Sequence, residues 1–231
     1  MIGVKHPNRY LRNYSLISKD EQTLLSSKTA AIIGAGGLGG HLAEQLARLG
    51  IGRIIVIDGD VFEESNLNRQ RFSTESRLGL SKAECIKQEL ADINSEVEVI
   101  SHQIRIDDQN GLQLLKDADV VMDGTDNIPT RLLLQRLCEE LQIPLIHGAI
   151  GGWYGQVSVV MPGDRTLSRL YPKEEMTGVE KHLGNPPFIP ALVASLQVAE
   201  CIKLLLGKGE ILRNSMLYVD TLNNQTIKID I

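Results

Sequence analysis

Apolar residues in the first part of the chain alternate between short continuous runs and longer stretches with helical spacing. Residues 29–33 and, after Arg53, residues 54–57 of the run 53–57 are continuous stretches of small or β-branched side chains, a pattern typical of strands buried on both faces. Between them, leucines repeat at spacings of four and three and predict a helix over 41–49, which two glycines end. Two buried strands joined through a helix predict a βαβ unit.

The same alternation continues toward the middle of the chain. Ser81 and Glu84 have the spacing of a capping box and predict the start of another helix. Further strands are predicted over 97–101, 118–122 and 144–147, and a further helix over 127–141. Strands that alternate with helices favour the α/β fold class, with a doubly wound, Rossmann-like parallel sheet.

Both ends of the chain depart from this pattern. Residues 1–27 predict a helical arm, and residues 28–150 form the alternating core. Residues 153–161 and the last twenty residues predict antiparallel strands, so the mostly parallel sheet is expected to end in a C-terminal antiparallel extension. The stretch 163–189 is rich in glycine, proline and charge and predicts a long crossover loop. Without a repeat or a low-complexity linker, residues 1–231 are expected to form a single domain.

Composition narrows the classes of function. Aromatic residues make up 4% of the chain and the net charge is −5, which argues against a partner that is a nucleic acid. The N-terminus has no apolar signal core, and the longest apolar stretch, 191–206, is interrupted by Gln197, Glu200 and Lys203. We therefore expect a cytoplasmic protein that does not bind a membrane.

A glycine-rich turn follows the first predicted strand. Residues 34–39 read GAGGLG, so Gly34, Gly36 and Gly39 fit the G-x-G-x-x-G pattern and Gly37 adds a fourth glycine. Such a turn lets phosphate approach the backbone and the free N–H groups of the following helix. Asp58 ends the second strand, where it can accept hydrogen bonds from ribose hydroxyls. The pattern predicts an adenine nucleotide and leaves NAD open.

Charged residues at the ends of later elements favour a triphosphate over NAD. Arg69 and Lys82 can neutralise phosphate charge, and Asp126 can hold Mg²⁺ through its carboxylate. Hydride transfer does not require these three side chains in one crevice, whereas cleavage of a triphosphate does.

Each of these residues also has a simpler interpretation. Arg69 and Lys82 fit solvated surface cations, and Asp126 fits a cap of the helix that starts near Asn127. Asn66 fits a turn residue, and Asp60 fits an ordinary acidic residue of a loop.

Taken in order, the motifs form a specific set: Arg9-Tyr10-x-Arg12, the 34–39 turn, Asp58-x-Asp60, Ser65-Asn66-Leu67-x-Arg69-Gln70, Lys82, Thr125-Asp126-Asn127, Gly148-Ala149 and Ser195-Leu196-Gln197. From about residue 9 to the C-terminus, the chain resembles the MoeB/ThiF/HesA family, relatives of the adenylation domain of ubiquitin-activating enzymes. This resemblance implies ATP-dependent adenylation of the C-terminal glycine carboxylate of a small ubiquitin-like sulfur-carrier protein of the ThiS/MoaD type, with Mg²⁺ as cofactor.

The resemblance also implies roles for individual residues. Arg12, Arg69, Lys82 and Asp126 would be catalytic, and Asp126 would also be the Mg²⁺ ligand. Arg12 would reach into the active site of a neighbouring protomer, which implies a homodimer. The nucleotide-binding set would be Gly34, Gly36, Gly37, Gly39, Asp58, Asp60, Asn66, Arg69, Gln70, Lys82, Asp126 and Asn127.

Two features of many relatives are missing from this sequence. Neither of the zinc-binding C-x-x-C pairs is present, and residues 165–169 read RTLSR where the first pair would fall. The crossover segment 176–184 contains no cysteine, and its His182 is interpreted as a solvated loop residue. We therefore expect no zinc, and adenylation without a thioester step. Sulfur would come from a separate sulfurtransferase or desulfurase, and Cys85, Cys138 and Cys201 are expected to be reduced core residues.

The crossover segment is expected to cover the extended tail of the carrier, with 148–155, including Trp153 and Tyr154, lining its channel. Three alternatives remain open: adenylation of another carboxylate (a peptide C-terminus or a modified tRNA base), an NAD-dependent oxidoreductase, and a non-catalytic nucleotide-binding scaffold. Neither the carrier nor its pathway (thiamine, molybdopterin or another) is specified by the sequence.

Overall fold

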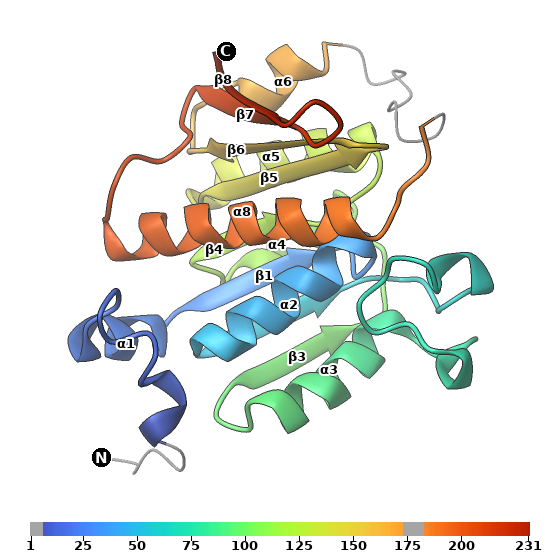
Figure 1. The fold of residues 1–231 in the computed structure, drawn as a ribbon, viewed down its shortest axis with the longest axis vertical. Coiled ribbons are helices and arrows are strands. Elements are labelled where there is room, and N and C mark those ends of the chain that lie inside the picture. The colour runs from blue at the N-terminus through green and yellow to red at the C-terminus, as the bar shows by residue number, and fades with distance from the viewer. Residues whose placement is uncertain (1–6, 173–182) are drawn as a thin grey trace.

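The central element of the fold is one eight-stranded sheet. In the computed structural model, which describes residues 7–172 and 183–231, the strand order is β3-β2-β1-β4-β5-β6-β7-β8 (Figure 1). Neighbouring strands from β3 to β5 pair in parallel, and those from β5 to β8 pair antiparallel, which confirms the predicted fold class. The strands are β1 (Thr29–Ile33), β2 (Arg53–Ile57), β3 (Glu98–His102), β4 (Val120–Asp123), β5 (Leu145–Gly151), β6 (Tyr154–Val160), β7 (Ser215–Asp220) and β8 (Gln225–Asp230).

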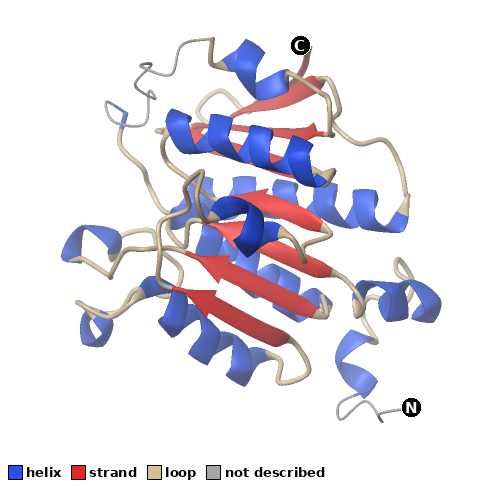
Figure 2. Ribbon diagram, turned by 180° about the vertical axis from the view of Figure 1, so that it is seen from behind, coloured by secondary structure: helices blue, strands red, loops and turns tan. Residues whose placement is uncertain are grey.

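Helices cover both faces of the sheet. One face carries α2 (Gly37–Leu49), α3 (Lys82–Ile93) and α8 (Phe188–Leu206), which lie in front in Figure 1. The other face carries α4 (Gly111–Leu115), α5 (Ile128–Leu141) and α6 (Thr166–Leu170), seen from behind in Figure 2. The N-terminal arm contains the 3-10 turn η1 (Pro7–Tyr10) and α1 (Lys19–Leu25), and the 59–80 loop contains η2 (Glu64–Asn66) and η3 (Glu75–Arg77).

Alternate residues of each buried strand pack against opposite layers of helices. In β1, Ala30 and Ile32 belong to the cluster under α2, α3 and α8, while Ala31 and Ile33 belong to the cluster under α4, α5 and α6. All five residues of β1 are buried, which explains its continuous apolar sequence.

Helix α8 is long and apolar enough to cross a bilayer, yet it packs against α2, β5 and β6. Its polar side chains have partners inside the protein. Gln197 Nε2 donates to the carbonyls of Asp123 (2.8 Å) and Ile146 (3.2 Å), and Glu200 Oε2 accepts from Leu212 N (2.9 Å). These buried contacts are those of a core helix in a globular fold.

The structure differs from the sequence prediction at the start of one helix and in two additional short helices. Helix α2 begins at Gly37, inside the predicted turn, because glycines 37 and 39 have helical geometry there. The short helices α4 and α6 were not predicted, since five residues carry too little periodicity. Residues 173–182, which include most of the cysteine-free crossover segment and His182, lie outside the described residues.

Candidate nucleotide-binding site

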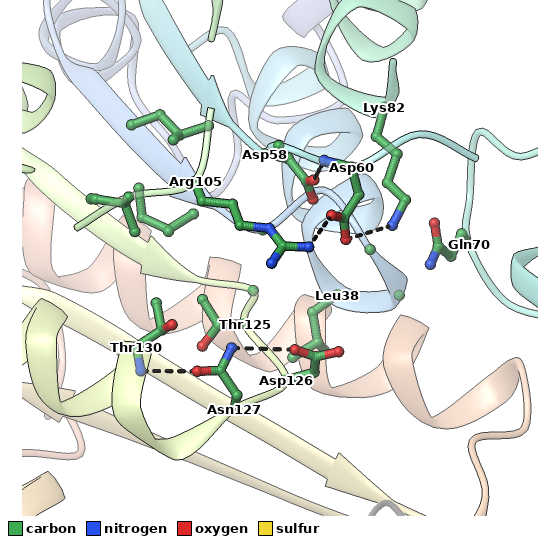
Figure 3. Close-up of a pocket in the computed structure, with 18 of the residues that line it drawn as sticks. Leu38, Asp58, Asp60, Gln70, Lys82, Arg105, Thr125, Asp126, Asn127 and Thr130 are labelled. Atoms are coloured by element: carbon green, nitrogen blue, oxygen red, sulfur yellow. Dashed lines mark hydrogen bonds and ion pairs between the residues drawn. The ribbon is translucent and has the colours of Figure 1, made fainter. Parts of the chain in front are cut away.

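A cavity of about 560 Å³ opens at the carboxyl ends of β1, β2 and β4. This is the edge where open α/β sheets bind ligands. Figure 3 shows acidic and basic side chains from several elements pointing into it. Ten of the residues predicted from the sequence line this cavity: Gly34, Gly36, Gly37, Asp58, Asp60, Arg69, Gln70, Lys82, Asp126 and Asn127.

The glycines of the 34–39 turn have two different roles. Gly34 has φ +87°, and a Cβ there would lie 2.7 Å from the Gly124 carbonyl oxygen, while a Cβ at Gly39 would lie 1.8 Å from the Gly34 carbonyl oxygen. These two glycines therefore let backbone pack on backbone. Gly36 and Gly37 have no atom within 3.4 Å of a built Cβ, so their surfaces remain open toward the cavity at the start of α2. Gly39, predicted to bind nucleotide, does not line the cavity.

Asp58 is held rigidly at the end of β2. Its Oδ2 accepts from Ala35 N (2.6 Å) and its Oδ1 accepts from Asp60 N (2.7 Å). Burial raises the pKa of Asp58, and the two backbone hydrogen bonds oppose that rise. A carboxylate tied to the glycine turn in this way can accept hydrogen bonds from a ribose next to the turn.

Two cations meet at Asp60. Lys82 Nζ lies 3.6 Å from Asp60 Oδ2, and Arg105 donates to Asp60 Oδ1 at 3.0 Å (Figure 3). Partial burial acts to raise the pKa of Asp60, but the hydrogen bond from Arg105 and the charge of Lys82 outweigh it and lower the pKa. The Lys82 side chain is only 8% exposed, so it is an anchored cation facing the cavity rather than a solvated surface residue.

Arg69 and Gln70 approach from the 59–80 loop. Arg69 Nη1 donates to the Ser65 carbonyl and to Asn68 Oδ1, both at 2.9 Å, which orients its guanidinium at the cavity wall. Gln70 is buried, and within the described residues its Oε1 has no hydrogen-bond donor. A buried acceptor without a partner at a cavity wall is suited to a donor from a ligand.

Asp126 provides an exposed carboxylate across the cavity from Lys82. Its Oδ1 accepts a long hydrogen bond of 3.4 Å from Asn127 Nδ2, while Asn127 Oδ1 caps α5 by accepting from Thr130 N (Figure 3). Asn127, and not Asp126, is therefore the helix cap. No group of three or more metal-ligating side chains occurs among the described residues. One free carboxylate facing a phosphate cradle nevertheless fits Mg²⁺, which is commonly held by one or two carboxylates together with substrate phosphates.

Two predicted residues lie away from the cavity. Asn66 is buried within η2, where its Oδ1 accepts from Glu63 N (3.0 Å), so its contacts are those of a turn residue. Arg12 is exposed and lies between η1 and α1 in the N-terminal arm. In Figure 1, α1 lies beside the start of β1, whereas the cavity opens where β1 ends. Within one protomer, Arg12 is therefore not part of this site.

The structure also adds residues that the sequence analysis missed. Arg105 lies between Ile104 and Ile106 on the loop after β3, and Thr125, Arg131 and Asn185 line the cavity from other elements. Arg105 could have been predicted from the sequence, because it follows the end of a strand on the edge of the sheet where ligands bind. Thr125 belongs to the Thr125-Asp126-Asn127 motif, but no role was predicted for it, and Arg131 and Asn185 belong to none of the motifs.

Comparison of the chain with known protein families identifies the family to which it belongs. The profile of the ThiF family matches residues 9–231. The chain belongs to the ThiF family. The predicted resemblance to MoeB/ThiF/HesA proteins is thereby confirmed.

Individual relatives of this ThiF-family chain cover most of its length. It is 34% identical over 221 residues to the SAMP-activating enzyme E1 of Haloferax volcanii, covering 94% of this chain and 82% of the relative. It is 35% identical over 218 residues to the adenylyltransferase and sulfurtransferase MOCS3 of Aedes aegypti, covering 92% of this chain. This chain spans 50% of the length of that MOCS3 protein.

Solved structures agree with the family. Escherichia coli MccB in complex with ATP superimposes with a TM-score of 0.80 at 26% identity, covering 96% of this chain and 71% of MccB. PaaA superimposes with a TM-score of 0.82 at 21% identity, covering 100% of this chain and 75% of PaaA, and this likeness concerns the fold. The relatives favour adenylation over the NAD-dependent alternative.

Proposed function

We propose that this chain uses ATP and Mg²⁺ to adenylate the C-terminal glycine carboxylate of a small ubiquitin-like carrier protein. The observation that supports this best is the convergence of the open start of α2, the anchored Lys82 and the exposed Asp126 on one cavity. Relatives named as an activating enzyme and as adenylyltransferases support the same enzyme class.

In this reaction a carboxylate oxygen of the carrier attacks the α-phosphorus of ATP. A C–O–P linkage forms, the bond from the α-phosphorus to the bridging oxygen breaks, and the electron pair leaves with pyrophosphate. No proton has to move, because the attacking carboxylate is already ionised. The barrier arises from bringing two anions together, and positioning alone contributes roughly 7–11 kcal/mol.

The residues of the cavity suit this task. Backbone N–H groups at the start of α2 and the Lys82 ammonium would bind the phosphates, while Arg69 has a forked guanidinium that can grip two oxygens. Asp58 would orient the ribose. Mg²⁺, held by Asp126 and the phosphates, would supply charge neutralisation at the transferred group.

The cysteines support a reaction that stops at the adenylate. All three cysteines of the chain are unpaired and buried, and burial raises the pKa of Cys201 to about 12. Burial also raises the pKa of Cys138 and of Cys85. A thiol that is not ionised is a poor nucleophile, so sulfur would be delivered by a separate sulfurtransferase or desulfurase. We propose in addition that no zinc is needed.

A homodimer would complete the site. Arg12 does not line the cavity of its own protomer, so it would act only in a second copy. The outer side of α8 is a suitable interface, because Leu192 is exposed and Leu196, Ile202 and Leu206 are only partly buried on it. Apolar side chains that are left partly exposed on the outer face of a helix suit such an interface.

The carrier would dock beside the cavity on exposed apolar side chains. The rings of Trp153 and Phe188 lie 4.8 Å apart and are 45% and 42% exposed, next to Leu183, which is 50% exposed. The hairpin tip is tied to this segment by a hydrogen bond from Gly152 N to the Gly184 carbonyl (2.8 Å). An exposed apolar cluster at the mouth of a site is suited to a protein partner.

A peptide C-terminus is a second candidate substrate. It is favoured by the likeness to MccB, which has been solved with the peptide MccA at 25% identity and a TM-score of 0.82, covering 96% of this chain and 71% of MccB. Both candidates use the same attack of a carboxylate on the α-phosphorus.

ATP–pyrophosphate exchange tests the proposal. Purified protein with Mg²⁺ and a carrier ending in Gly-Gly is expected to show exchange, and the same carrier lacking its last two glycines is expected to show none. Exchange with a short peptide and with no carrier would support the second candidate instead. Absence of ATP binding would overturn both.

A further inference from the structure

A cluster of polar side chains lies beneath the cavity, and the proposed reaction leaves it without a role. We call the buried Asp123, Arg131 and His147, together with the half-buried Gln156 and Tyr171 beside them, the buried polar cluster. They come from β4, α5, β5, β6 and the residues after α6. The side chains of Asp123 and His147 are 0% exposed, and that of Arg131 is 3% exposed. Burying charged groups costs free energy unless they are paired, so the burial of Asp123 and Arg131 needs an explanation.

The charge state of the cluster follows from its contacts. Asp123 Oδ2 lies 2.7 Å from His147 Nδ1 and 4.0 Å from Arg131 Nε. Burial acts to raise the pKa of Asp123, but the hydrogen bond from His147 and the charge of Arg131 outweigh it and lower the pKa. Burial lowers the pKa of His147. Asp123 is therefore an ionised carboxylate and His147 a neutral imidazole that donates from Nδ1.

The other ring nitrogen of His147 faces two donors. Nε2 lies 3.3 Å from the Tyr171 hydroxyl and 3.1 Å from Gln156 Nε2, and Gln156 Nε2 also donates to the Tyr171 oxygen at 2.6 Å. The Arg131 guanidinium lies over the Tyr171 ring, 5.6 Å from its centroid. Tyr171 thus contacts both His147, through its hydroxyl, and Arg131, through its ring.

At its other end, the cluster holds the residue before Asp126. Asp123 Oδ1 accepts from Thr125 N at 2.9 Å and from Thr125 Oγ1 at 2.7 Å. Arg131 Nη2 donates to the Thr125 carbonyl at 3.0 Å. Both backbone polar groups of Thr125 are therefore tied to the cluster. Asp123 and Arg131 therefore orient the peptide between Thr125 and Asp126.

We propose that Tyr171 and His147 are positioning residues that act through Asp123 and Arg131 to aim Asp126 at the metal-bound triphosphate. This inference rests on the proposed function, because it assigns Asp126 to Mg²⁺. Partners that orient a metal-binding side chain from behind commonly change metal affinity about 10- to 100-fold when removed. A purely structural cluster would change the stability of the protein instead.

The test compares Tyr171→Phe with a matched control, Tyr218→Phe. Tyr218 stacks on Tyr154 at the antiparallel end of the sheet and belongs to no part of the cluster. The affinity for Mn²⁺ is measured by electron paramagnetic resonance with a non-hydrolysable ATP analogue bound. The affinity for the analogue without metal and the unfolding temperature are measured in parallel.

Tyr171→Phe is expected to weaken Mn²⁺ binding roughly tenfold, while metal-free analogue binding stays within about twofold and Tyr218→Phe matches the wild type. Equal Mn²⁺ affinity in Tyr171→Phe and wild type would overturn the inference, as would an equal loss of metal-bound and metal-free nucleotide affinity. Absence of Mn²⁺ binding to the wild-type nucleotide complex would instead overturn the proposed function. Gln156→Met, which removes the donor to both Tyr171 and His147, is expected to show the same selective loss if Tyr171→Phe does not fold.

Discussion

The parallel and antiparallel halves of the sheet contribute to the cavity in different ways. The parallel half, β1 to β4, supplies nearly all groups that face the cavity, and they follow directly after strand ends or begin helices. The antiparallel half, β5 to β8, supplies His147 and Gln156 to the buried polar cluster beneath Asp126. The turn between β5 and β6 supplies Trp153, whose exposed ring packs on Phe188 of α8. In the proposed reaction, the parallel half would bind ATP, while the antiparallel half would help to position Asp126 and would contact the acyl substrate.

The largest effect is expected at Asp126. Asp126→Ala should lower pyrophosphate exchange by about 10³-fold, roughly 4 kcal/mol, because Mg²⁺ would lose its protein ligand. Asp108→Ala, which removes an exposed acid paired with Arg136, is the matched control and should leave exchange unchanged. Exchange rates at saturating ATP measure both, and equal rates for the two variants would remove Asp126 from the reaction.

A pair of glycine variants separates packing from nucleotide contact within the parallel half. Gly39→Ala should destabilise the fold by about 3 kcal/mol, because the new Cβ would meet the Gly34 carbonyl oxygen. Gly37→Ala has ordinary space, 3.5 Å from Pro190, and should fold normally but bind ATP more weakly. Denaturant unfolding and ATP titration check the pair, and normal stability of Gly39→Ala would contradict the packing role.

These glycines show what the sequence could and could not predict. The G-x-G-x-x-G pattern located the turn, but only the close approach of Gly39 to Gly34 shows that one glycine serves packing. The strands, α2, α3 and α5 were predictable because buried runs and helical spacing are local signals. The buried polar cluster was not, because Asp123 and His147 are 24 residues apart and Arg131 and Tyr171 are 40 apart.

Substitutions of Lys82 and Arg105, the two cations that contact Asp60, test which of them matters more for ATP. Lys82→Met should lower exchange by about 10²-fold, because a buried cation beside the phosphates would be lost. Arg105→Met should raise the KM for ATP only about threefold, because this exposed side chain is screened by solvent. Steady-state exchange measured against ATP concentration gives both effects. A larger effect from Arg105→Met than from Lys82→Met would contradict the conclusion that Lys82 is the more important cation.

The antiparallel half should respond through the acyl substrate. Trp153→Ala is expected to raise the KM for the carrier about tenfold, because the carrier would lose its contact with an exposed aromatic side chain. ATP affinity should stay unchanged, because Trp153 does not line the cavity. Parallel titrations of carrier and ATP check this prediction. A loss of ATP affinity would contradict the separate roles of the two halves of the sheet.

The last prediction concerns the second protomer, and the expected result is a partial recovery of activity. Arg12→Ala and Asp126→Ala are each expected to be inactive, but an equal mixture of the two should recover about a quarter of wild-type exchange. Random mixing puts both variants together in half of the dimers, and one of the two sites in each such dimer is intact. Mixing after mild dissociation and re-association tests this, and a mixture without activity would show that Arg12 does not act across a dimer.

The most direct test of the central claim follows the oxygen atoms of the substrate carboxylate. A carrier with an ¹⁸O-labelled C-terminal carboxylate is incubated with enzyme, ATP and Mg²⁺, and hydroxylamine then releases the acyl group. Attack on the α-phosphorus predicts one ¹⁸O in the AMP and none in inorganic phosphate. Label in inorganic phosphate, with ADP as the nucleotide product, would show attack on the γ-phosphorus and contradict adenylation.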